Sequence, residues 1–290
     1  DPQVEHDSSL LETCETITKI FVEIAEGSES LIFSSKAVQI GQMEIVSQLL
    51  ECCRFKYDLS TSLLPVRFFG NLCLELGDAN ERKMDAAEIG DRDGVDAEDF
   101  VLNTYTPILG TFLEIGLEQM CVDESLFVLR EEGESHNDDR DLVLSEDDVE
   151  KRKEWVLFCK DASEALYSDK VLQRLGMLLQ EKIGEIQSSE DASSVQWAPI
   201  ESILFALQAI LPDVRDRQNE VIHWLLETVL SFPNLHLINL TKIDLLGKAG
   251  FYLALNPDRL GEVLEYLCST LKQRPYASRS ARAIMGLLQK

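Results

Sequence analysis

The sequence predicts an all-α fold in which antiparallel pairs of helices stack side by side. One observation is a pair of helical patterns between Trp197 and Lys290 that occurs twice, with the second copy 42 residues after the first. Another is the spacing of apolar residues elsewhere, which follows the period of a helix and nowhere the alternation of a strand. A third is the position of prolines at the starts and ends of the expected helices, where a proline does not break the helix.

The positions that match at this offset are apolar in both copies. In the first helix of the pair, Ile203, Leu204, Ile210 and Leu211 correspond to Leu245, Leu246, Tyr252 and Leu253. In the second helix, Ile222, Trp224, Leu225 and Val229 correspond to Leu264, Tyr266, Leu267 and Leu271, and Pro233 then corresponds to Pro275. A period of about 40 to 47 residues made of two helices is typical of HEAT solenoids. We therefore predict a single HEAT-repeat array over residues 1–290, coiled as a right-handed superhelix, with its clearest repeats at 195–290.

Earlier parts of the chain predict further helices, each with an apolar stripe. The first begins at the capping box Ser9-x-x-Glu12 and ends at Gly27. The others are expected at about 43–53, 64–76, 100–121, 147–166 and 169–186, and we expect Gly77 to end the helix at 64–76.

Two acidic inserts interrupt this pattern, at about 78–99 and 131–150. The first has nine acidic and three basic residues, and the second has ten acidic residues against Arg140 alone. With few apolar side chains, neither is expected to bury a face, and we predict connectors that are mobile in solution. The second insert ends in Ser145 and three acids, which favour the start of a helix.

The strong negative charge limits the choice of partner. There are 52 acidic and 27 basic residues, a net charge of -25, which repels nucleic acid and attracts basic proteins, although it also keeps an elongated molecule soluble. The inserts either guide basic partners to the protein or are solvated segments with no partner. A small cluster of basic residues near the end of the chain could pair with neighbouring repeats or with an acidic or phosphorylated ligand. Its members are Lys272, Arg274, Arg279, Arg282 and Lys290. The candidate partner-binding residues are Asp138, Asp139, Asp141, Glu146, Asp147, Asp148, Arg279 and Arg282.

No motif predicts an enzyme, a cofactor or a metal site. The seven cysteines include no Cys-x-x-Cys pair, and we interpret them as reduced thiols of an intracellular protein. Asp91 to Asp96 is similar to a calcium loop, but its glycine is at the fourth position and Leu102 is at the twelfth, where a glutamate is required. His223 and His236 have no carboxylate or cysteine at ligand spacing. Neither a signal peptide nor a membrane span is expected.

The residues of the repeated block resemble the importin-β superfamily of nuclear transport receptors, most closely the transportin-SR and importin-thirteen branch. The similarity in residues covers about 195–290. Before residue 195, only the expected arrangement of helices is similar. It rests on Trp197, Glu201, Leu204, Phe205 and Ala209, on Thr241, Leu246 and Gly247, and on Asn256, Pro257, Leu260, Leu264, Tyr266, Leu267, Pro275 and the stretch ASRSARAI.

This resemblance implies a central segment of a receptor that moves between cytoplasm and nucleus. Its expected partners are Ser-Arg-rich or basic cargo such as splicing factors, nucleoporins, and the Ran GTPase. Ran is expected to bind mainly through repeats outside this chain, and no dense arginine helix of the kind that binds Ser-Arg cargo in the family is present. The alternative is a HEAT scaffold or regulatory subunit of another complex, and a third possibility is an enzyme whose site is built from the acidic residues. Asp1 in place of a start methionine suggests an excised fragment.

Overall fold

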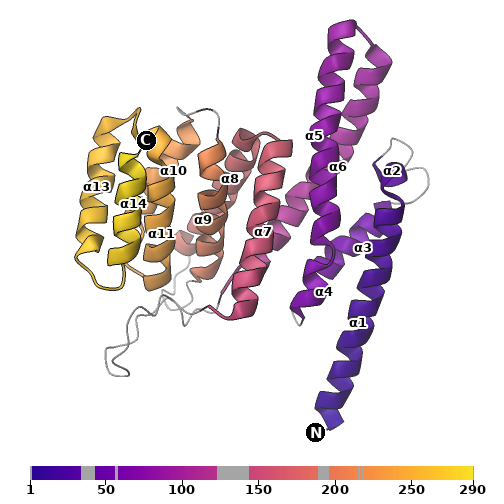
Figure 1. Cartoon of the computed structure of the whole chain (residues 1–290), viewed down its shortest axis with the longest axis horizontal. Coiled ribbons are helices and arrows are strands. Elements are labelled where there is room, and N and C mark those ends of the chain that lie inside the picture. Colours follow the sequence, from indigo (N-terminus) through magenta and orange to yellow (C-terminus); the bar gives the residue numbers. More distant parts are fainter. Residues whose placement is uncertain are drawn as a thin grey trace. The chain divides into compact units, whose positions relative to one another are not determined.

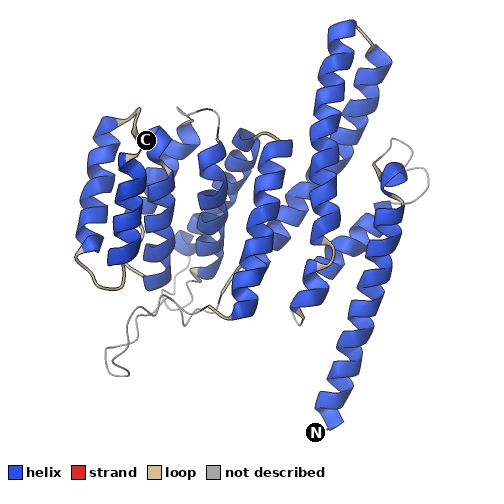
Figure 2. Cartoon of the chain, in the orientation of Figure 1, coloured by secondary structure: helices blue, strands red, loops and turns tan. Residues whose placement is uncertain are grey.

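The computed structural model describes residues 2–33, 43–55, 58–122, 144–188, 196–214, 216 and 219–289. All regular secondary structure within these residues is helical, which confirms the all-α prediction (Figure 2). The chain divides into two compact units. Unit 1 contains Asp1–Met120 with Val149–Leu166, and unit 2 contains Cys121–Asp148 with Tyr167–Lys290. A single continuous array over both units is a prediction.

The elements of unit 1 are α1 (Pro2–Gly27), α2 (Glu29–Ile32), α3 (Met43–Cys53), α4 (Leu59–Leu63), α5 (Val66–Ile89), α6 (Arg92–Gln119) and most of α7 (Glu146–Ala165). Those of unit 2 are α8 (Ser168–Ser188), α9 (Ala198–Ile210), the short 3-10 helix η3 (Leu211–Asp213), α10 (Glu220–Ser231), α11 (His236–Lys248), α12 (Gly250–Leu253), α13 (Pro257–Leu271) and α14 (Ala277–Leu288).

Unit 2 has helices at the 42-residue offset that the sequence predicts. At an offset of 42 residues, α9 and η3 correspond to α11 and α12, and α10 corresponds to α13. The helices α9, α11 and α14 lie side by side, while α13 packs against α14 (Figure 1). Most matched positions are buried in both copies, among them Leu225 and Leu267. The contacts thus form a row of neighbouring helices, α8, α9, α11 and α14, with α13 against α14.

Polar contacts also join neighbouring helices of this row. The fully buried Glu201 on α9 accepts a hydrogen bond of 2.6 Å from the hydroxyl of Thr241 on α11. At Gly247 on α11, an added Cβ would lie 2.9 Å from the Cα of Ala283 on α14, so only glycine permits this approach. Glu201, Thr241 and Gly247 therefore lie at contacts between neighbouring helices of this row.

Unit 1 is built around a cluster of aromatic side chains. Phe112 on α6 stacks on Phe69 of α5 with ring centroids 4.0 Å apart. It also meets Trp155 at 4.6 Å and Phe158 at 4.4 Å, both on α7. These four side chains are buried. Aromatic pairs at such distances stabilise a core beyond the effect of their burial, so the cluster fixes how α5, α6 and α7 pack.

A buried arginine closes the end of α6 in the same unit. The guanidinium of Arg152 on α7 donates two hydrogen bonds to the carbonyl of Met120, at 3.1 Å from Nε and 2.9 Å from Nη2. The last carbonyls of a helix have no partner within the helix. Arg152 therefore satisfies one of them with a charged donor, a role that its sequence position did not suggest.

The first acidic insert, predicted as a mobile connector at 78–99, is instead a hairpin of two long helices. The prediction that the third helix stops at Gly77 is wrong as well, because α5 continues to Ile89. Gly90 ends α5 with a positive φ of 77°, and the carboxylate of Asp91 caps α6 by accepting from the amide of Gly94 at 3.1 Å. The connected ends of α5 and α6 project beyond the other helices of unit 1 (Figure 1).

Small residues and ion pairs explain why this acidic segment is helical. Ala79 and Ala86 are buried and give α5 an inner face. On the outside, Arg82 bridges to Glu98 at 2.9 Å and to Glu75 at 2.7 Å, and these bonds raise its pKa. Lys83 pairs with Asp99 at 2.5 Å. Pairing across the hairpin offsets part of the charge, so a high acid content does not prevent a folded arm.

Other helix boundaries agree with the sequence more closely. The first helix ends at Gly27 as predicted but begins at Pro2 rather than Ser9. The Ser145 cap is confirmed, since its hydroxyl accepts a hydrogen bond of 3.0 Å from the amide of Asp148 at the start of α7. Of the second insert, residues 131–143 lie outside the described residues.

Candidate interaction surface

The structure places five of the eight predicted partner-binding residues. Asp138, Asp139 and Asp141 lie outside the described residues. Glu146 and Asp147 are exposed in the first turn of α7, while Asp148 is half-buried and accepts a hydrogen bond of 2.7 Å from the hydroxyl of Ser145. Carboxylates in a first turn are stabilised by the helix dipole, so these acids have a structural role whether or not a partner binds.

The two candidate partner-binding residues of the predicted basic cluster, Arg279 and Arg282, differ in their surroundings. Arg279 on α14 donates a hydrogen bond of 2.7 Å to Asp244 on α11, inside the same unit. Burial raises the pKa of Asp244, and the charges of Arg279 and Arg282 oppose that increase. Arg282 is exposed. Arg279 is therefore paired with a neighbouring helix of unit 2, which agrees with the first of the two alternatives for this cluster.

A group of acids on α5 was not singled out from the sequence. Four exposed carboxylates recur at intervals of three and four residues, so they lie along the outer face of one helix. Like charges at this spacing destabilise a helix slightly, by roughly 0.2–0.5 kcal/mol per pair. The side chains of this α5 acidic stripe are Asp78, Glu81, Asp85 and Glu88.

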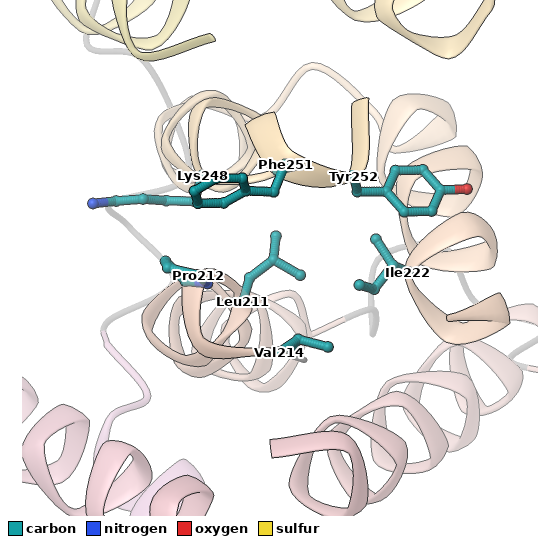
Figure 3. Close-up of a pocket in the computed structure, with 8 residues that line it drawn as sticks. Leu211, Pro212, Val214, Ile222, Lys248, Phe251 and Tyr252 are labelled. Carbon is teal, nitrogen blue, oxygen red and sulfur yellow. The ribbon is translucent and has the colours of Figure 1, made fainter. Parts of the chain in front are cut away.

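Unit 2 contains a small, shallow apolar hollow that is partly open to solvent (Figure 3). Leu211 and Ile222 point into it, whereas the ammonium of Lys248 and the hydroxyl of Tyr252 point away from it (Figure 3). That hydroxyl lies 2.8 Å from Nδ1 of His223. Small-molecule sites combine an apolar pocket with a few converging polar groups. This hollow lacks them. Its lining residues are Leu211, Pro212, Val214, Ile222, Lys248, Ala249, Phe251 and Tyr252.

Both histidines considered in the sequence have aromatic partners. His223 is exposed, and besides Tyr252 it lies 3.5 Å from Glu227, one helical turn along α10. The expectation that no carboxylate stands at ligand spacing from His223 is therefore wrong. His236 lies 3.2 Å from the hydroxyl of Tyr276, and burial together with the charge of Arg279 lowers its pKa. Each histidine therefore joins helices of unit 2 through a ring contact.

One lysine of unit 2, for which the sequence predicts no role, is buried. Lys242 on α11 is almost fully buried. Its Nζ lies 4.2 Å from the centroid of the Tyr266 ring and donates a hydrogen bond of 3.2 Å to the carbonyl of Leu230. Burial lowers the pKa of Lys242 from 10.5 to about 8.

Because of this lysine, we expect the stability of the protein to vary with pH in the alkaline range. Between about pH 8 and 10.5 the unfolded chain binds more protons at Lys242 than the folded chain, so this residue raises the free energy of unfolding as pH rises through that window. We expect the stability of the wild type relative to Lys242→Met to increase by roughly 2 kcal/mol from pH 7.5 to 10.5. Urea unfolding of both proteins at the two pH values measures this increase. If the difference in free energy of unfolding between wild type and Lys242→Met were the same at both pH values, the lowered pKa would be contradicted.

A search against models of protein families finds no match for this chain. In the part of the chain that the structure describes, no helix combines the length and apolar character needed to cross a membrane. No group of three or more His, Cys, Asp or Glu side chains suited to a metal ion occurs among the same residues.

Proposed function

We propose that this chain is a central HEAT segment of a nuclear import receptor, similar to the transportin-SR and importin-thirteen branch of the importin-β superfamily. It binds basic, Ser-Arg-rich cargo such as splicing factors and moves between cytoplasm and nucleus with nucleoporins and the Ran GTPase as further partners. Its role is binding rather than catalysis.

The repeat in unit 2 is the observation that supports this proposal most strongly. Two helix pairs offset by 42 residues bury matching positions, and the residues that resemble the receptor branch lie at their contacts, including Glu201, Thr241 and Gly247. In a solenoid each repeat contacts mainly its neighbours, so small changes at each contact add up to a change of pitch. Such a change would let Ran-GTP at one site weaken cargo binding at another.

The charge distribution supports a basic cargo. The net charge is -25, and the α5 acidic stripe presents four exposed carboxylates at helical spacing. Exposed charges of one sign mainly accelerate association with a partner of opposite sign, and salt weakens that effect. A cargo rich in arginine satisfies this requirement.

We expect a fluorescent Ser-Arg repeat peptide to bind the chain, and binding to weaken as NaCl rises from 50 to 300 mM. Neutralising the α5 acidic stripe with Asn and Gln should weaken binding by about tenfold at low salt, because each exposed ion pair contributes up to about 1 kcal/mol. Fluorescence anisotropy measures both effects, with the unphosphorylated and the phosphorylated peptide compared.

A matched control separates this stripe from the overall charge. A second variant neutralises four exposed acids elsewhere and changes the net charge equally. If both variants lost the same affinity for the Ser-Arg peptide, the α5 acidic stripe would not be a cargo surface. The control acids are Glu44, Glu181, Asp258 and Glu265.

The dependence on Ran distinguishes a transport receptor from a HEAT scaffold or regulatory subunit of another complex. A polypeptide that also contains the amino-terminal repeats of such a receptor should release the Ser-Arg peptide when Ran-GTP is added, and retain it with Ran-GDP. Peptide binding that is insensitive to Ran-GTP would overturn the transport proposal and favour the scaffold.

A further inference from the structure

Helix α1 has apolar side chains on two faces, and only one of them is covered. Val22 and Ala25 are buried with Thr18, one helical turn apart along one line. This face belongs to the side on which α1 contacts α3, α4 and α5 of unit 1. A single covered stripe is what an amphipathic helix at the edge of a unit needs, so a second apolar face requires an explanation.

The second face has four large aliphatic side chains that remain close to half exposed. The exposed fractions are 58% for Leu10, 48% for Ile17, 51% for Ile20 and 45% for Ile24. Three of them follow one another at intervals of seven residues, nearly two turns, and the fourth lies one turn beyond Ile17. We call these four residues the α1 apolar stripe.

The stripe continues around the helix into the buried face. Cys14 and Phe21 are half-buried and lie between the two faces. The apolar arc therefore covers more than the width of a single core-facing stripe, which is typical of a helix that packs on more than one side. Burying one such aliphatic side chain contributes about 1.5–3 kcal/mol, so a second helix along this face would be stabilising.

The outer edge of the α1 apolar stripe is anionic. Glu12 and Glu23 are exposed and eleven residues apart, about three turns or 16 Å, so they lie on the same edge. Lys19 lies near this edge, but its Nζ is 2.7 Å from the carboxylate of Glu15. A partner aligned with the stripe therefore meets two carboxylates of the same edge.

We propose that the α1 apolar stripe binds an amphipathic helix from outside this chain, with apolar residues at i, i+3 or i+4 and i+7 and with Lys or Arg facing Glu12 and Glu23. A second copy of the chain does not fit this description, because its own stripe has the same glutamate edge and its net charge is also -25. The inference does not rest on nuclear transport, since any helical partner with this charge pattern satisfies it.

The test uses a synthetic peptide of 21 residues with leucine on one face and lysine along one edge. Two control peptides replace the lysines by glutamate or the leucines by serine. Fluorescence anisotropy should show binding of the first peptide alone, and Ile17→Asp should weaken it by about tenfold or more. Leu74→Asp, which changes a still more exposed leucine on α5, should leave binding unchanged.

A charge exchange tests the edge separately. The double variant Glu12→Lys with Glu23→Lys should lose affinity for the lysine-edged peptide and gain affinity for the glutamate-edged one. Circular dichroism should show unchanged helix content in every variant, because the altered side chains are exposed.

Several results would overturn the proposal. One is an equal loss of peptide affinity in Ile17→Asp and Leu74→Asp. Another is equal affinity of the wild type for the lysine-edged and the glutamate-edged peptide. A third is a mass from sedimentation that is half as large for Ile17→Asp as for the wild type. The last result would assign the stripe to a second copy of the chain.

Discussion

Replacing Phe112 by alanine is expected to reduce the free energy of unfolding by about 4 kcal/mol. The ring is fully buried and contacts three aromatic side chains from α5 and α7, at centroid distances of 4.0 to 4.6 Å. Its removal leaves a cavity that these rigid rings cannot fill. Chemical denaturation followed by circular dichroism measures the loss.

Phe100 is the matched control for this prediction. It lies on the same helix, but its side chain is 38% exposed, so Phe100→Ala removes less buried surface and should cost about 1 kcal/mol or less. Similar costs for the two substitutions would show that the cluster around Phe112 is not the core of unit 1.

The fold could be predicted from the sequence where apolar spacing and helix-ending residues agree. In unit 2, the 42-residue offset correctly paired Leu225 with Leu267 as buried positions. It was less accurate at the end of the second pair, where Val229 is buried but Leu271 is 40% exposed. Val229 lies on α10, which contacts both α8 and α11, whereas Leu271 is the last residue of α13. An offset in sequence gives no information about which neighbours cover a position.

The acidic insert at 78–99 shows why composition alone gave a wrong prediction. A count of charges implied a segment without a buried face, yet a two-helix hairpin needs only small residues such as Ala79 on its inner side. Arg82 reaches Glu98 across the hairpin, sixteen residues along the chain. Contacts of this kind depend on the turn at Gly90, where α5 ends, and a count of charges does not reveal that turn.

The candidate surface was predicted less well than the fold, for a related reason. Sequence reasoning selected acids by their density, which emphasised the segment around Asp138, outside the described residues. The α5 acidic stripe and the α1 apolar stripe depend instead on which side of a helix is covered. Their helical spacing is present in the sequence, but the spacing alone does not distinguish an exposed face from a buried one.

Gly116→Ala is expected to destabilise the protein by roughly 3 kcal/mol, although alanine favours a helix more than glycine does. A Cβ at this position of α6 would lie 2.3 Å from Cε3 of Trp155 and 2.7 Å from its Cζ3. The indole cannot move away without disturbing Phe112 and Phe158, which it contacts at 4.6 and 6.1 Å. Gly110 on the same helix provides the control, because an added Cβ there meets nothing within 4 Å. Gly110→Ala should therefore stabilise the protein by up to about 1 kcal/mol. Thermal and chemical denaturation of both variants measure the two effects, and a stabilised Gly116→Ala variant would mean that α6 and α7 do not pack at this distance.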